Sequence, residues 1–70
     1  MPDHPELTNQ LKALRSSAGL TQAELAHMIG VSRKTVNTVE NGIFVPSTIL
    51  ALKLSKALGV RVEQVFELKR

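Results

Sequence analysis

A run of polar side chains between positions 32 and 41 carries the clearest chemical pattern in this sequence. If the segment is helical, with about 3.6 residues per turn, its residues separate into two sides. One side carries Val36 and Val39, with Glu40 beside them. The other side can form hydrogen bonds and holds no acid, and its residues are Lys34, Asn37, Thr38 and Asn41, flanked by Arg33 and Thr35. Such a face suits a helix in the major groove of duplex DNA, where base edges offer donors, acceptors and thymine methyl groups.

The residues around this run predict a helix, a tight turn and a second helix. Thr21 can cap the first helix, and Glu24 three residues later would complete a capping box. Gly30 tolerates the left-handed conformation that a helix C-cap requires. Ser32 can then cap the second helix. These signals place the polar run on the second helix, over residues 32–41.

From the residues alone, two other interpretations stay open. A polar outer face is usually no more than the solvated face of an amphipathic helix. Asn41-Gly42, flanked by Thr-Val-Glu and Ile-Phe-Val, could also form the turn of a β-hairpin. Pro46 would shorten the second strand of that hairpin, and Ser32 already signals a helix. The combination of caps, turn glycine and spaced valines therefore favours two helices.

The segment Thr21–Gly42, TQAELAHMIGVSRKTVNTVENG, resembles the helix-turn-helix of the phage-repressor family, the Cro and lambda-repressor type also called the xenobiotic-response-element family. Leu11–Leu20 resembles the first helix of that family, Pro46–Val60 the fourth and Val62–Phe66 the fifth. The resemblance implies one DNA-binding domain over residues 1–70, with its helix-turn-helix core at 21–42. It also implies a sequence-specific regulator of transcription, more specifically a repressor, that binds a double-stranded operator.

The resemblance assigns roles to individual polar residues. Arg33 and Lys34 are the leading candidates for reading base edges, and guanine is the preferred partner of both side chains. The full set of base-reading candidates is Arg33, Lys34, Asn37 and Thr38, and the phosphate-contacting candidates are Gln22, Thr35 and Asn41. Phosphate contacts of this kind position a protein on DNA without specifying sequence.

One pair of charged residues is expected to be structural. Glu40 falls on the inward side of its helix, where a lone carboxylate would be costly to bury. In the family, an arginine and a glutamate at two matching places form a partly buried ion pair. Arg15 and Glu40 occupy those places here.

The loop after the second helix departs from the family pattern. Relatives often carry lysine or arginine there, whereas this chain has Ile43, Phe44 and Val45. We therefore expect modest affinity and a shallow salt dependence for each monomer. With Ile49 and Leu52, these residues would form an exposed apolar patch, which predicts a homodimer. The alternative is that Phe44 and Val45 fold over the monomer's own core.

The remaining segments predict an all-α bundle of five helices. The first helix begins either with Pro5 in its first turn or with Asn9 as its cap, and the segment at 7–8 is open to a short strand. Residues 1–5 are expected to fray. Inward stripes are predicted at Leu25, Met28 and Ile29, and at Leu50, Ala51, Leu54 and Leu58 of a helix capped by Ser47 and ended by Gly59. The last helix covers about 62–66, with Arg61 as a poor cap.

Composition narrows the class of protein further. The 70 residues include no cysteine and only two aromatic residues, which favours an aliphatic helical core over a disulfide or zinc scaffold. A net charge of +3 is compatible with a nucleic-acid partner. No signal segment or long apolar run is visible, so we expect a soluble, cytoplasmic protein.

Catalysis finds no support in the residue pattern. His4 and His27 are the only histidines, and no serine stands in a recognisable catalytic constellation. We expect no enzyme activity, metal, cofactor, small-molecule ligand or membrane partner. The competing interpretation is a protein-interaction or antitoxin-like module that uses the same fold, because a fold does not fix a function.

Overall fold

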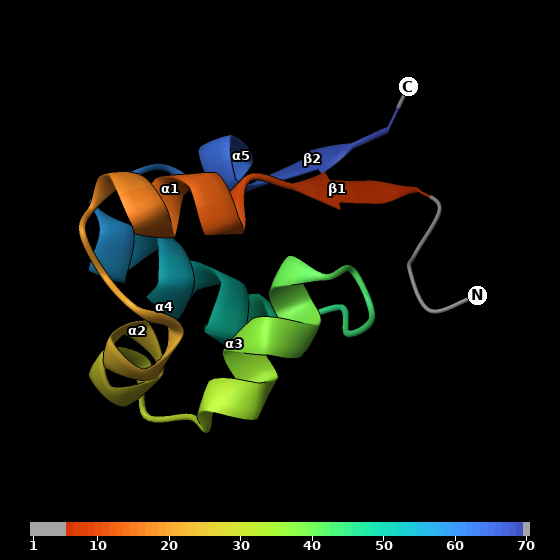
Figure 1. Ribbon diagram of the computed structural model, residues 1–70. Coiled ribbons are helices and arrows are strands. Elements are labelled where there is room, and N and C mark those ends of the chain that lie inside the picture. The colour runs from red at the N-terminus through yellow and green to blue at the C-terminus, as the bar shows by residue number, and fades with distance from the viewer. Residues whose placement is uncertain (1–5, 70) are drawn as a thin grey trace.

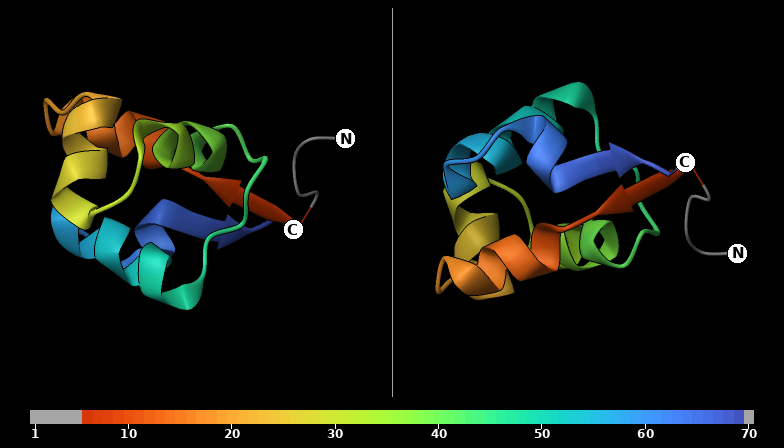
Figure 2. Two further views of the ribbon diagram at one scale, coloured as in Figure 1. Left: turned by 90° about the horizontal axis from the view of Figure 1, so that it is seen from below. Right: turned by 90° about the horizontal axis from the view of Figure 1, so that it is seen from above.

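The computed structural model describes residues 6–69, which form five helices and two short strands. In chain order these are β1 (Leu7–Asn9), α1 (Leu11–Ser17), α2 (Gln22–Ile29), α3 (Arg33–Glu40), α4 (Thr48–Leu58), α5 (Val62–Val65) and β2 (Phe66–Leu68), as Figure 1 shows. Figure 2 shows α1 and α3 along one side of the molecule and α4 and α5 along the other. Helix α2 closes one end, and the two strands run toward the opposite end.

Local hydrogen bonds set the ends of α2 and α3 where the sequence predicts them. Thr21 Oγ1 accepts from the Glu24 backbone N–H at 3.0 Å, and Glu24 Oε1 accepts from the Thr21 N–H at 2.8 Å, which completes the capping box. Gly30 ends α2 with a φ of 75°, in the left-handed region that costs a residue with a Cβ about 1–2 kcal/mol. Ser32 Oγ then accepts from the Thr35 N–H at 3.2 Å and starts α3.

Helix α4 follows its prediction at both ends. Ser47 Oγ accepts from the Leu50 N–H at 3.1 Å, and Gly59 follows the last helical residue in a left-handed conformation. Within its predicted stripe, Leu54 is buried, and the others, Leu50, Ala51 and Leu58, are half-buried. Helices α2 and α5 both pack against α4.

Helix α5 is short and has the weak start that its sequence predicts. Arg61 offers no side-chain cap, although its backbone N–H donates to Gln64 Oε1 at 2.8 Å. The helix ends at Val65, which is buried. Phe66 already has extended backbone and begins β2, so the predicted helix end at 66 is one residue too late.

One aliphatic core connects the helices, and its members come from all five of them. The buried apolar residues are Leu11, Leu25, Ala26, Ile29, Val36, Val39, Leu54 and Val65. Met28 was predicted in the inward stripe of α2, but its side chain is 53% exposed. The inward side of this eight-residue helix is already occupied by Leu25, Ala26 and Ile29, which leaves Met28 at the edge.

A small antiparallel sheet corrects the all-α prediction. Strand β1 pairs with β2, with Leu7 opposite Leu68 and Asn9 opposite Phe66, and Figure 2 shows the two strands side by side. Each strand has three residues, which is too short for an alternating pattern to be recognised in the sequence.

The sheet also decides where α1 begins. Because residues 7–9 are in β1, α1 starts at Leu11 and the longer version of this helix is wrong. The N-cap of α1 is Gln10, one residue after the predicted cap Asn9, and it makes no side-chain cap hydrogen bond. Asn9 Oδ1 instead accepts from the Leu11 N–H at 3.0 Å. Residues 1–5, including the proposed start at Pro5 and the expected fraying, lie outside the described part of the chain.

Candidate nucleic-acid interface

Helix α3 is held to the core by its two valines, and its other side carries the predicted base-reading residues. Arg33 and Lys34, in the first turn, are exposed. Asn37 and Thr38, one turn later, are half-buried but still accessible. The structure therefore presents two cations and two polar side chains along one short helix of eight residues.

The three predicted phosphate contacts lie around these side chains. Gln22 is the first residue of α2, and its Oε1 accepts from Arg33 Nη1 at 3.4 Å. Thr35 Oγ1 lies 3.1 Å from Ser32 Oγ in the first turn of α3. Asn41 follows the last residue of α3 and donates through Nδ2 to the Asn37 side chain at 3.2 Å. Residues from two helices and their ends are thus brought close to the outward side of α3.

The predicted structural pair forms a short ion pair between α1 and α3. Arg15 Nε donates to Glu40 Oε2 at 2.5 Å, and Nη2 donates to Oε1 at 3.3 Å. The two side chains are only 12% and 3% exposed. Arg15 Nη1 also donates to the Leu20 carbonyl at 2.8 Å, which ties the end of α1 to the loop before α2. The hydrogen bond to Glu40 raises the pKa of Arg15 above its ordinary value.

Gln22 connects this ion pair to the outward side of α3. Its Nε2 donates to Glu40 Oε1 at 3.0 Å. An ionised carboxylate can only accept hydrogen bonds, so the amide must turn its NH₂ group inward and its oxygen outward. That oxygen is the atom that accepts from Arg33. A structural ion pair therefore determines which atom of Gln22 faces Arg33.

The apolar loop after α3 is anchored to that helix by its backbone. The N–H groups of Ile43 and Phe44 both donate to the Thr38 carbonyl, at 3.0 and 3.2 Å. Gly42 makes this reversal possible with a φ of 74°. The loop is thus fixed beside α3 at the level of Thr38.

All five residues of the predicted apolar patch are exposed. Their exposed fractions are 53% for Ile43, 46% for Phe44, 46% for Val45, 68% for Ile49 and 53% for Leu52. Phe44 and Val45 are each about half exposed, and neither is among the residues that form or pack against the buried core. Residues of the patch line two different hollows. Phe44 lines a hollow beside α3, whereas Val45 and Leu52 line a separate apolar hollow together with Phe66.

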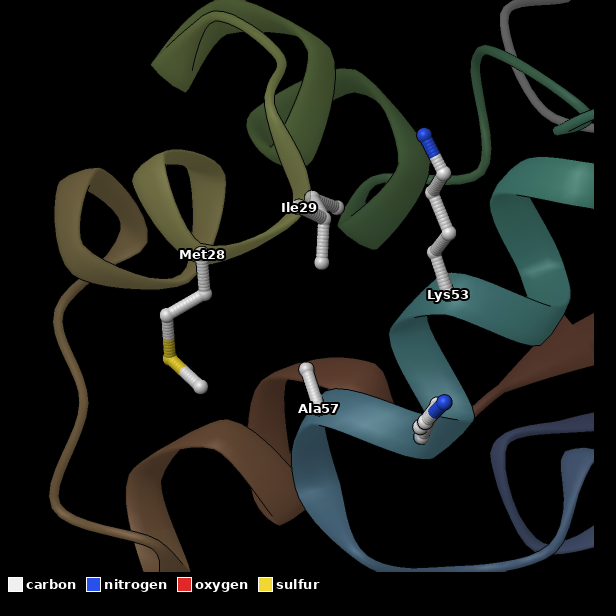
Figure 3. Close-up of a pocket in the computed structure, with 5 residues that line it drawn as sticks. Met28, Ile29, Lys53 and Ala57 are labelled. Atoms are coloured by element: carbon white, nitrogen blue, oxygen red, sulfur yellow. The ribbon is translucent and has the colours of Figure 1, made fainter.

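Another hollow, of about 280 Å³, lies between α2 and α4. Figure 3 shows Met28 and Ile29 reaching it from α2, with Lys53 and Ala57 on α4. Its walls are aliphatic apart from two lysines, so it offers no acid, nucleophile or hydrogen-bond acceptor of its own from a side chain. Across residues 6–69, we find no group of three His, Asp or Glu side chains suited to a metal ion. No helix among those residues is long and apolar enough to cross a membrane.

Two features of this interface were not predicted from the sequence. Asn9 Nδ2 donates to the Val39 carbonyl at 3.0 Å, so β1 supports the end of α3. The hollow shared by α3 and the loop was also missed, because Ile43 and Phe44 were assigned only to a dimer patch. The apolar loop beside a polar helix was the available signal, but only the hydrogen bonds to Thr38 show which element the loop follows.

Comparison with known proteins shows a consistent set of similarities. Residues 11–65 match the family model described as helix-turn-helix. The chain is 43% identical over 63 residues to the uncharacterized HTH-type transcriptional regulator YgzD of Bacillus subtilis, covering 90% of this chain and 96% of that protein. It is also 43% identical over 60 residues to an uncharacterized HTH-type transcriptional regulator of Methanocaldococcus jannaschii, covering 86% of this chain and 91% of that protein.

Solved structures share the same backbone arrangement. The restriction-modification controller protein C.AhdI of Aeromonas hydrophila is 37% identical, with a TM-score of 0.73 over 77% of this chain and 82% of that one. A Bacteroides fragilis protein gives a TM-score of 0.80 at 23% identity, over 87% of this chain and 98% of that one, and this likeness concerns the fold alone. The helical arrangement around α2 and α3 is therefore one that other proteins also adopt.

Proposed function

The chain belongs to the helix-turn-helix family of DNA-binding transcription regulators, and on that premise we propose that it is a repressor that binds a double-stranded operator as a homodimer. Helix α3 lies in the major groove, where Arg33 and Lys34 read base edges. Residues 1–70 act as one DNA-binding domain, in the cytoplasm. The family is a class of regulators rather than of enzymes.

The observation that supports this proposal most strongly is that α3 carries its cations on the outward side, while its one carboxylate is bound on the inward side. The only carboxylate on α3, Glu40, is bound by Arg15 and Gln22, so it does not oppose the phosphate backbone from the outward side. Arg33 is positioned beside the first turn of α2, whose backbone N–H groups attract phosphate. In this arrangement Asn37 and Thr38 contribute further base contacts, while Gln22, Thr35 and Asn41 contact phosphates.

The homodimer rests on the exposed apolar patch. A small protein rarely leaves several large apolar side chains together in water unless they form an interface. One recognition helix reads few base pairs, and helix-turn-helix dimers read two half-sites about 34–36 Å apart. We assign the contact between the two copies to Ile43, Phe44 and Val45 of the loop and to Ile49 and Leu52 of α4. Repression follows if such a dimer occupies the operator and excludes the transcription machinery.

Selection from a random duplex pool, followed by titration at several salt concentrations, tests the proposal. We expect a recovered site with two related halves, and an affinity that falls with salt as phosphates are neutralised by lysine and arginine. The rival function is a protein-interaction or antitoxin-like module. A protein that enriches no sequence and binds duplex DNA without salt dependence would favour that rival.

A further inference from the structure

The hollow between α3 and the loop has a composition unlike the rest of the DNA-facing side. Its volume is about 370 Å³, and it is lined by Ser32, Lys34, Thr35, Thr38, Ile43 and Phe44. Its apolar side chains are Ile43 and Phe44 of the loop, and its polar residues belong to α3 and to the N-cap of that helix. Since these α3 residues include proposed DNA contacts, a second copy of the chain seated here would block the recognition face. The occupant should therefore come from the DNA.

The threonine hydroxyls of the hollow are already engaged within α3. Thr38 Oγ1 donates to the Thr35 carbonyl at 2.9 Å, and Thr35 Oγ1 is 3.1 Å from Ser32 Oγ. Each of these hydroxyls already makes one hydrogen bond within the protein, and each threonine also carries a methyl group that can make apolar contacts. Phe44 and Ile43 are held next to Thr38 by the two hydrogen bonds to its carbonyl. The apolar side chains of the hollow thus come from a loop whose backbone is hydrogen-bonded to α3.

Among the four bases, only thymine presents an apolar group in the major groove, its C5-methyl, and threonine methyl and phenylalanine side chains are suitable contacts for it. Thymine also presents an acceptor, O4, on the neighbouring ring carbon. The Lys34 ammonium at the edge of the hollow can donate to such an acceptor.

We propose that this hollow receives the C5-methyl group of a pyrimidine in the operator, with Phe44 and Thr38 as the specificity-determining contacts. Thymine is the preferred source, because its O4 also suits Lys34. The same methyl group on 5-methylcytosine would make the apolar contact, but its neighbouring N4 amino group is a donor and gives Lys34 no acceptor. This inference rests on the proposed function, and it moves Phe44 from the dimer contact to base recognition.

The test replaces each thymine of the selected operator, one position per half-site, by deoxyuridine, which lacks only the methyl group. At one position we expect affinity to fall about fourfold per half-site, which corresponds to roughly 0.8 kcal/mol for one buried carbon. A second pair of duplexes carries cytosine or 5-methylcytosine at that position. A gain with 5-methylcytosine shows that the hollow accepts the methyl group from either base, and an effect with thymine alone assigns the site to thymine.

Variants connect the methyl effect to the hollow. Phe44→Ala and Thr38→Ser should each reduce the thymine-to-uracil ratio toward one, whereas Phe44→Leu should preserve it. The control Met28→Ala changes an exposed apolar residue of α2, outside the hollow and the proposed dimer contact, and should also preserve the ratio. Phe44 is about half exposed and Thr38→Ser removes only a methyl group, so at least one variant should keep its circular dichroism spectrum.

Two results would overturn the inference. One is a wild-type protein that binds its operator equally well with thymine or uracil at every position. The other is a methyl effect that persists unchanged in both Phe44→Ala and Thr38→Ser. Failure to bind any duplex is a different result, because it removes the proposed function itself.

Discussion

Gln22 donates its side-chain amide to Glu40 at 3.0 Å, from the first residue of α2 to the last residue of α3. Through this bond, the Glu40 carboxylate serves two groups of residues. One carboxylate oxygen accepts from Arg15 of α1. The bond to Gln22 also orients the Gln22 amide oxygen, which accepts from Arg33. The two effects can be separated by substitution, because one changes the free energy of unfolding and the other changes DNA binding.

Glu40→Ala should lower the free energy of unfolding by about 3–5 kcal/mol, because it leaves the largely buried Arg15 guanidinium without its carboxylate. Urea unfolding followed by circular dichroism measures the change. A matched control is Glu63→Ala, which removes an exposed carboxylate from α5 and should stay within about 0.5 kcal/mol of wild type. A loss of no more than about 1 kcal/mol for Glu40→Ala would mean that solvent screens the pair as it does on a surface.

Gln22→Ala should weaken operator and scrambled duplexes by similar factors, because a phosphate contact carries no base information. We expect a loss of about 0.5–1.5 kcal/mol on both, the ordinary value of one hydrogen bond. Fluorescence anisotropy at low salt can measure both affinities. If the loss falls on the operator alone, Gln22 reads sequence, directly or through Arg33, and its assignment to phosphate is wrong.

The helix ends could be predicted because their causes are local. Thr21 with Glu24, and Ser47 with Leu50, form hydrogen bonds across three residues, so the sequence contains both partners within one turn. The β1–β2 sheet has no such local cause. Thr8 Oγ1 donates to the Glu67 carbonyl from 59 positions away, and the pairing depends on how the helices bring the two ends together.

The candidate interface was also predictable in part: its helical residues could be assigned from the sequence, and the position of the loop beside them could not. Helical periodicity identified the outward side of α3, and the family resemblance suggested the Arg15–Glu40 contact that the structure contains. The neighbours of Phe44 could not be inferred, because periodicity does not apply to a loop. Its position beside Thr38 follows from two backbone hydrogen bonds that any residue types could form.

The double variant Ile49→Glu, Leu52→Glu should be monomeric, because two carboxylates would have to be buried at the proposed contact between copies. Sedimentation equilibrium measures the mass of each protein in solution. Met28→Glu is the control, since Met28 is as exposed as Leu52, at 53%, but lies on α2. A wild-type protein that stays monomeric at high concentration and on its operator would contradict the homodimer. A folded double variant that still dimerises would instead show that the contact between the two copies lies elsewhere than at Ile49 and Leu52.

The central claim is that the outward side of α3 reads DNA, and operator affinity measured for Arg33→Ala and Lys34→Ala tests it most directly. Each substitution should cost about 1–3 kcal/mol on the selected operator and less on a scrambled duplex, because bidentate base contacts are lost. Lys56→Ala on α4 removes the same charge from an exposed lysine outside α3 and should leave the preference for the operator unchanged. If Arg33→Ala and Lys34→Ala both bind the operator as tightly as Lys56→Ala does, the recognition face has been assigned to the wrong side of the molecule.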